Sequence, residues 1–208
     1  MALKRKSRLR RKTTLIANTG MMSRKSPLKR SQSTTGANKR ISKAKPRTKR
    51  QKKMEMKRKL CEQYELPNLP CSRWGTAKAP TRTDLLRGML WTVFSKYIRQ
   101  RDLGKPCITC NKTLHLGDIQ AGHYAPVGNS PLSLWFNETN VNGECPRCNA
   151  DFHGWHLVPM RKNLVKRYSE TAIEEIDAIQ QVKRAVKWEE HEYVERIKKY
   201  LDLLDETP

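Results

Sequence analysis

The chain has 208 residues and a formal net charge of +23, because 43 lysines and arginines stand against 20 aspartates and glutamates. Residues 1–59 hold 23 of those basic residues and a single acid, Glu55, so this segment carries +22 and the rest of the chain only +1. This asymmetry excludes a uniformly charged globule. No apolar run approaches the roughly 20 residues that a bilayer-spanning helix needs, which argues against a membrane protein.

Residues 1–59 form a basic arm with too few apolar residues to build a hydrophobic core. The segment contains no aromatic residue and is rich in Ser, Thr and Lys. Its sparse apolar side chains cannot offset about 1–2 kcal/mol per residue of backbone ordering entropy, so we expect residues 1–53 to be disordered in the free protein. An Arg- and Ser-rich start also resembles an organellar transit peptide. The basic residues come in blocks without an opposing apolar face, which favours binding to a polyanion such as DNA.

The composition changes after residue 53, and the pattern predicts a body made largely of helices. Residues 54–64 can form a short charged helix, which Pro67 and Pro70 must interrupt. Apolar residues then recur at helical spacing over 84–101, with a cap near Thr83 or Asp84. We divide the chain into four parts: an arm (1–59), a linker (60–83), a core (84–168) and a C-terminal helical pair (169–208).

The C-terminal helices follow from capping and periodicity. Pro159 suits the first turn of a helix that runs to about Tyr168, and its basic residues are candidates for phosphate contacts. Thr171 and Glu174 have the spacing of a capping box, and a further amphipathic helix is expected over about 188–204. We expect these last two helices to form an antiparallel pair that serves as core or as a dimer surface.

Four cysteines give the strongest chemical signal. Cys107 and Cys110 form one Cys-x-x-Cys pair, Cys145 and Cys148 form another, and 34 residues separate the pairs. Two such turns supply the four thiolates of a tetrahedral zinc site. Disulfides are the alternative, but no secretory signal is recognisable and an intracellular protein keeps its thiols reduced, so structural Zn²⁺ is favoured. Cys61 and Cys71 are expected to be free thiols.

Three polar residues lie at characteristic places around these cysteines. His123 lies near the end of a short predicted strand, Asn140 lies five residues before the second pair, and His153 lies on the predicted helix after that pair. Hydrolysis of a phosphodiester needs a base near neutral pH, for which His123 is the candidate. It also needs a divalent cation, Mg²⁺ or Mn²⁺, which His153 and a nearby oxygen ligand would hold, while Asn140 would orient the loop or the His123 imidazole. This order resembles the HNH, or ββα-metal, nuclease motif.

The flanking residues narrow the resemblance. The segments Pro106-Cys-Ile-Thr-Cys110, Ala121-Gly-His-Tyr124, Trp135-Phe-Asn-Glu-Thr-Asn140 and Leu157-Val-Pro-Met-Arg161 are similar to the bacteriophage NinG (Rap) recombination-endonuclease family. The resemblance covers roughly residues 84–204. It implies a structure-selective endonuclease that acts on branched DNA, such as Holliday junctions and D-loops, in the cytoplasm of the host bacterium. It also implies products with 5′-phosphate and 3′-hydroxyl ends.

Two departures from that pattern concern the catalytic metal. Gly122 precedes His123, where HNH sites often carry an acidic residue or a second His, and similar NinG sequences tend to carry Asp where this chain has Gln120. Asp118 is a candidate for the missing oxygen ligand, and a metal held with more water molecules is the alternative. His153 and His156 both follow the second cysteine pair, and we favour His153 because it lies closer to it in sequence.

The sequence therefore predicts an α+β protein: a small zinc-knuckle, HNH-like nuclease core packed with flanking helices, preceded by a disordered basic arm. The expected partner is DNA, with no membrane partner, and a homodimer would match the two-fold symmetry of a four-way junction. Two alternatives stay open. One is a zinc module that binds DNA without cutting it, and the other is an HNH endonuclease that reads sequence.

Overall fold

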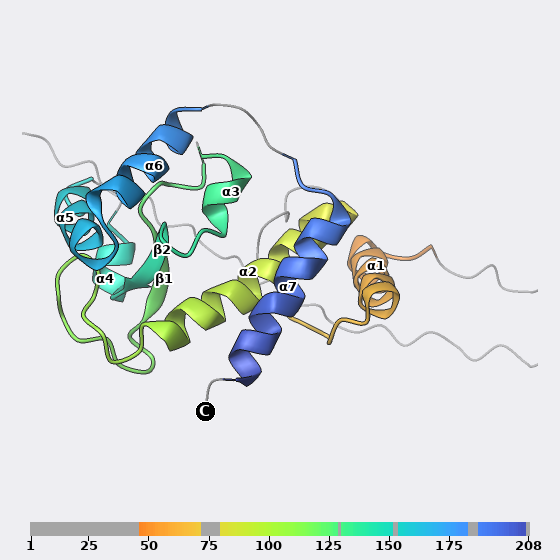
Figure 1. Ribbon diagram of the computed structural model, residues 1–208. Coiled ribbons are helices and arrows are strands. Elements are labelled where there is room, and N and C mark those ends of the chain that lie inside the picture. The colour runs from red at the N-terminus through yellow and green to blue at the C-terminus, as the bar shows by residue number, and fades with distance from the viewer. Residues whose placement is uncertain (1–45, 72–79, 129, 152–153, 183–186, 207–208) are drawn as a thin grey trace, which may run out of the picture. The chain divides into compact units, whose positions relative to one another are not determined.

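The computed structural model describes residues 46–71, 80–128, 130–151, 154–182 and 187–206. Seven helices and two strands occur in these residues (Figure 1). In chain order they are α1 (Lys49–Tyr64), α2 (Arg82–Arg101), β1 (Gln120–His123), α3 (Leu132–Trp135), β2 (Val141–Glu144), α4 (Pro146–Asn149), α5 (Leu157–Arg167), α6 (Glu170–Gln181) and α7 (Glu190–Asp205). The arrangement is α+β, as predicted. No helix in the described residues is both long and apolar enough to cross a membrane.

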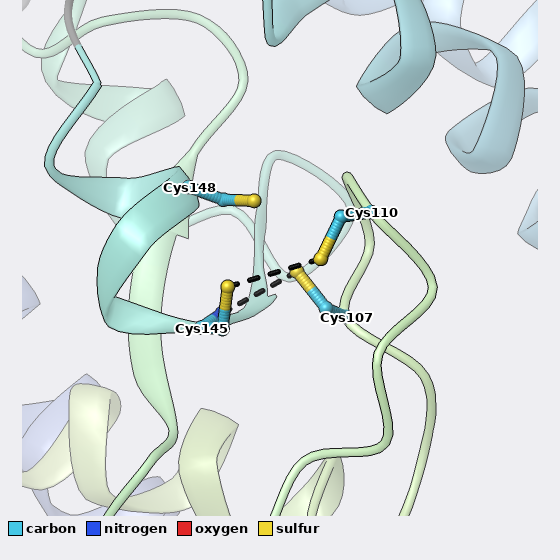
Figure 2. A group of neighbouring side chains, drawn as sticks. All are labelled: Cys107, Cys110, Cys145 and Cys148. Atoms are coloured by element: carbon cyan, nitrogen blue, oxygen red, sulfur yellow. Dashed lines mark hydrogen bonds between the residues drawn. The ribbon is translucent and has the colours of Figure 1, made fainter.

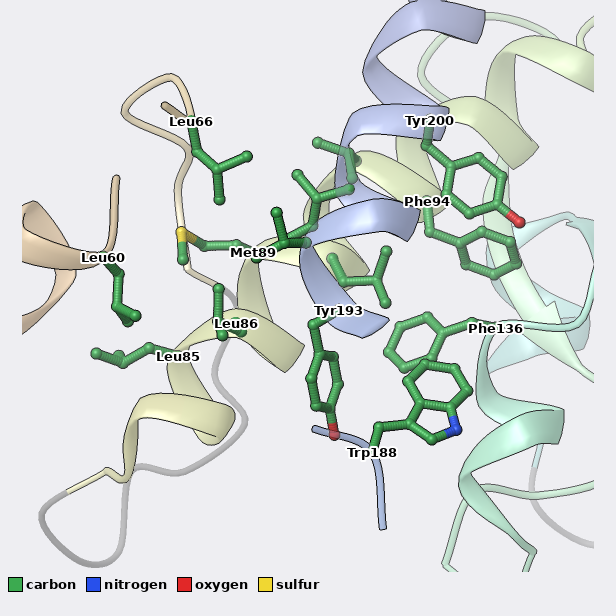
Figure 3. Packing of buried hydrophobic residues seen from close by; sticks show 14 of the residues in the cluster. Leu60, Leu66, Leu85, Leu86, Met89, Phe94, Phe136, Trp188, Tyr193 and Tyr200 are labelled. Carbon is green, nitrogen blue, oxygen red and sulfur yellow. The ribbon is translucent and has the colours of Figure 1, made fainter. Parts of the chain in front are cut away.

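Helices α2 and α7 pack against each other and build the larger core (Figure 3). Helix α2 begins at a capping box in which the Thr81 hydroxyl accepts from the Asp84 N–H and the Asp84 carboxylate accepts from the Thr81 N–H. The cap therefore lies two to three residues before the predicted one. Phe94 is fully buried between Phe136 and Tyr200, with ring centroids 5.8 and 4.9 Å away. Burial of one such side chain contributes about 1.5–3 kcal/mol.

Helix α1 begins earlier than the sequence predicted. Thr48 and Gln51 form a capping box, so residues 49–53, which we expected to be disordered, are the first turns of a helix. Leu60 is fully buried in the same core as α2, which explains the difference, because this tertiary contact stabilises a segment whose own composition is unfavourable. Residues 1–45 of the arm lie outside the described residues.

The two strands form an antiparallel ribbon, with Gln120 opposite Glu144 and His123 opposite Val141. Side chains alternate between the faces of a strand, so Gln120 and Gly122 face one side while Ala121 and His123 face the other. Both α2 and α4 contact β1. Strand β2 leads through Cys145 directly into α4, where Pro146 occupies the first helical position.

The expected C-terminal helical pair is wrong. Helix α6 packs on α5 and α3 in a second core, whereas α7 packs on α2 in the first (Figure 1). Ile173 and Ile176 of α6 lie with Met160 and Leu164 of α5. Helix α6 therefore packs on the helix just before it in the chain, and α7 packs on a helix far from it in sequence, so the two do not form a pair.

Candidate metal and catalytic site

The four predicted zinc ligands converge on one point (Figure 2). The Sγ atoms of Cys107, Cys110, Cys145 and Cys148 all lie within 4.8 Å of one another, and Cys110 Sγ is 3.8 Å from Cys145 Sγ. All four cysteines are free, and all but Cys110 are buried. A tetrahedral ion with Zn–S bonds of about 2.3 Å separates its sulfur ligands by about 3.8 Å. The cluster therefore has the dimensions and the donor atoms of a structural zinc site.

Local backbone geometry presents these sulfurs. Asn111 has a positive φ of 63° and donates its N–H to the Cys107 carbonyl at 3.0 Å, which closes the first turn. The Ile108 N–H donates to the Gly143 carbonyl at 3.1 Å and ties this turn to β2. The Cys145 N–H donates to Cys107 Sγ at 3.3 Å, which favours a charged sulfur. Burial and hydrogen bonding with Cys145 raise the pKa of the Cys148 thiol, so a thiolate there needs a neighbouring cation.

His123 ends strand β1, as predicted, and contacts the ring of Trp91 and the backbone carbonyl of Trp135. Its ring stacks on Trp91 of α2, with centroids 5.0 Å apart and planes inclined by 18°. Its Nε2 lies 3.1 Å from the Trp135 carbonyl oxygen. Burial lowers the pKa of His123 to about 4, although the carbonyl contact acts in the opposite direction. His123 is therefore neutral at pH 7.

Asn140 is fully buried and fixes the loop between the strands. Its Oδ1 accepts from the Ala125 N–H at 2.7 Å, and its Nδ2 donates to the carbonyls of Leu134 and Ala125 at 2.8 and 3.3 Å. The sequence suggested that Asn140 orients either the loop or the His123 imidazole, and these contacts fit the first role. No contact between Asn140 and the His123 imidazole occurs among these hydrogen bonds.

The proposed oxygen ligand Asp118 lies beside the cysteine cluster. Its carboxylate is 55% exposed and pairs with Lys112 at 3.5 Å. It lines a hollow together with Cys110, Cys145 and Trp155. Because β1 rises about 3.3 Å per residue, the three steps from Gln120 to His123 already span about 10 Å, and Asp118 precedes Gln120. The structure thus brings Asp118 to the cysteines and not to His123. His153 lies outside the described residues.

A buried ionic network joins the ribbon to the helices, and sequence reasoning missed it. Asp102 is 1% exposed and accepts from Arg101 at 2.8 Å, from Arg167 at 3.3 Å and from the Gly143 N–H at 2.8 Å. Burial alone would raise the pKa of Asp102, but the hydrogen bond and charge of Arg101 lower it overall. Arg167, considered from the sequence as a phosphate contact, is thus engaged inside the protein.

Two further residues at the ribbon were not predicted as functional. Trp91 lies in the apolar pattern that predicted the helix over 84–101, and it is the ring on which His123 stacks. Glu144, the residue before Cys145, is buried at 2% exposure, and its Oε1 accepts from the Thr109 hydroxyl at 2.5 Å. The sequence shows that Glu144 lies next to a predicted zinc ligand. Its position opposite Gln120 depends on strand pairing, which the sequence alone does not give.

A short antiparallel ribbon with helices packed around it, and a cluster of four cysteines that could bind a metal such as zinc, define a small α+β protein with a candidate structural metal site. The family model described as "Bacteriophage Lambda NinG protein" matches residues 11–207, and the chain belongs to this family.

Three curated relatives are similar over a shorter segment. Protein ninG of Escherichia phage lambda is 40% identical over 82 residues, and protein ninG of Escherichia phage 933W is 39% identical over the same length. Protein ninG of Enterobacteria phage H19B is 38% identical over 82 residues. Each alignment covers 39% of this chain and 39% of the relative. No solved structure matches the chain.

Proposed function

We propose that the protein is a metal-dependent endonuclease of phage recombination that hydrolyses phosphodiester bonds in branched DNA, such as Holliday junctions and D-loops. The observation that carries this proposal is the setting of His123. A carbonyl oxygen can only accept a hydrogen bond, so Nε2 of a neutral His123 must hold the proton and donate it to Trp135. Nδ1 is then the basic nitrogen.

His123 acts as the general base in this mechanism. Its Nδ1 takes a proton from water, the resulting hydroxide oxygen bonds to phosphorus, and the bond from phosphorus to the 3′ oxygen breaks. The leaving 3′ oxygen takes a proton from solvent, which gives the 3′-hydroxyl and 5′-phosphate ends that family resemblance implies. A pKa of about 4 leaves His123 fully deprotonated at pH 7. It also makes His123 a weaker base than an ordinary histidine, so each proton transfer from water is less favourable.

Metals have two separate roles in the proposal. Zn²⁺ on Cys107, Cys110, Cys145 and Cys148 holds β2 and α4 against the loop that carries the first cysteine pair. A second cation, Mg²⁺ or Mn²⁺, neutralises charge that develops on the phosphate and the leaving oxygen when it is bound. From the sequence its ligands are His153 and Asp118, but the pairing of Asp118 with Lys112 weakens the case for that residue.

The basic arm supplies affinity for DNA. Lys49, Arg50 and Lys52 are exposed on α1 and continue the charge of the preceding residues. Such cations release condensed counterions from the DNA backbone, which gives salt-sensitive binding with little sequence preference. We propose that the protein acts as a homodimer on the two-fold symmetric junction. Light scattering that returns a monomer at micromolar concentration would count against the dimer.

A DNA-binding module without catalysis is the second candidate, and the packing of His123 favours it. The imidazole is half-buried and stacked on Trp91, which is also how a purely structural histidine would lie. The two functions predict different results when the imidazole is removed and the fold is kept. The endonuclease should lose its cleavage activity, whereas a binding module has none to lose.

The test compares wild type with His123→Gln and with His115→Gln, which changes an exposed histidine. Each protein is incubated with a four-way junction, a linear duplex and single strands, in Mg²⁺, Mn²⁺ or EDTA. We expect cleavage of the junction by wild type and His115→Gln only, and none in EDTA. Binding without cutting in any metal leaves the non-catalytic module. Equal cutting by His123→Gln excludes this base, and equal cutting of the linear duplex excludes branch selectivity.

A further inference from the structure

Glu144 is a buried carboxylate that has no lysine or arginine partner among the described residues. It is 2% exposed, and no Lys or Arg of the described residues forms an ion pair with it. Asp102, equally buried in the same ribbon, has Arg101 and Arg167 as partners. An ionised carboxylate that is removed from water costs several kcal/mol unless it is paired or bound to a metal. Among the described residues, the hydrogen-bond donor that reaches Glu144 is the hydroxyl of Thr109.

Gly122 makes room for this carboxylate. A Cβ atom at residue 122 would lie 2.7 Å from Glu144 Cδ and 2.9 Å from Asn149 Oδ1, both too close for a real side chain. The two groups therefore converge on the space above Gly122, and by the sum of these distances they are at most 5.6 Å apart. Two oxygen donors at this separation can share one cation.

Asn149 and His156 present their acceptor atoms to the same region. Asn149 Nδ2 donates to Gln120 Oε1 at 2.7 Å, which fixes the amide and leaves Oδ1 toward Gly122. His156 Nδ1 is buried and has no hydrogen-bond partner among the described residues. His156 lies near enough to Glu144 for a charge on one side chain to act on the other.

We propose that Glu144, Asn149 and His156 bind one divalent cation, Mn²⁺ or Mg²⁺, at the ribbon face opposite to His123. A cation there neutralises the buried carboxylate and gives the His156 nitrogen a partner. Carboxylate, amide oxygen and imidazole donors suit a harder ion than the four thiolates do, so the two metal sites are chemically distinct. The assignment of this cation to phosphodiester cleavage rests on the proposed function, whereas its binding does not.

Binding is measured directly, by electron paramagnetic resonance of added Mn²⁺ with the zinc-loaded, full-length protein. We expect Glu144→Gln, which keeps the size and removes the charge, to weaken Mn²⁺ binding by roughly tenfold or more. His156→Ala is expected to do the same. Gly122→Ala serves as an independent variant, because its Cβ displaces the carboxylate while every ligand remains. Glu174→Gln and His115→Ala, which change an exposed carboxylate and an exposed histidine, are the matched controls and should bind Mn²⁺ as wild type does.

The zinc content of each variant shows whether the fold is intact, and should equal that of wild type. Wild-type affinity in zinc-replete Glu144→Gln or Gly122→Ala overturns the site, as does loss of binding in the control Glu174→Gln. Mn²⁺ binding that depends on Glu144 without cleavage of any DNA supports the site and excludes the nuclease. Metal-dependent cleavage with unchanged Mn²⁺ binding in Glu144→Gln supports the nuclease and overturns the site.

Discussion

The burial of His123 makes a quantitative prediction about stability. Its pKa falls from 6.5 to about 4 on folding, so between these pH values the unfolded chain binds a proton that the folded protein does not. The free energy of unfolding must therefore rise with pH through this window and be lost as pH falls. At 1.36 kcal/mol per pH unit the full contribution is about 3 kcal/mol, of which about 2 kcal/mol is already lost at pH 5.

The assay is urea denaturation of wild type and His123→Gln at pH 7.5 and at pH 5. Protonation of the cysteines weakens zinc binding in both proteins, so only the difference between them reports His123. We expect wild type to lose about 2 kcal/mol more than the variant between the two pH values. Equal losses would refute the buried, neutral imidazole. So would an NMR titration of the His123 ring protons with a midpoint near 6.5.

Three further predictions follow from the structure. Cys145→Ser should abolish the single zinc per chain measured by metal analysis and unfold or strongly destabilise residues 84–168, whereas Cys71→Ser should retain the zinc. Asp102→Ala should lower the free energy of unfolding by about 3–5 kcal/mol in urea, because the partly buried Arg101 and Arg167 lose their carboxylate partner and the Gly143 N–H loses its acceptor, while Asp118→Ala should change it by less than about 1 kcal/mol. Deletion of residues 1–45 should weaken DNA binding and flatten its salt dependence in filter-binding assays, while metal-dependent cleavage at low salt persists; loss of that cleavage would contradict a division between arm and body.

Much of the local structure could be predicted from the sequence. Helix α2 was expected from the spacing of its apolar residues, and the cysteine cluster from two Cys-x-x-Cys pairs. The strand that ends at His123 was also expected. The helix and the strand depend mainly on neighbouring residues. The cysteine cluster could be predicted because zinc ligands have a specific chemistry and spacing, even without knowledge of the long-range contacts.

Long-range contacts were the part that the sequence did not reveal. The first turns of α1 are stabilised by the burial of Leu60 in a core formed with α2, which the charged composition of the segment conceals. The partners of α6 and α7 depend on which apolar stripe lies near enough in space, and periodicity identifies the stripe but not its partner. The basic residues of α5 show the same limit, because Arg161 and Arg167 are bound by acidic residues of the protein.

The position of Gly122 shows how register can alter the interpretation of a motif. The sequence indicates that Gly122 stands where a metal ligand is expected beside His123. Asp118, four residues before it, was the candidate replacement. In the structure the antiparallel register sets Glu144 diagonally across from Gly122, and its carboxylate occupies the space that a side chain at residue 122 would fill. The two residues are 22 positions apart in sequence, so only strand pairing brings them together. Although residue 122 has no acidic side chain, the carboxylate of Glu144 therefore lies where such a side chain would be.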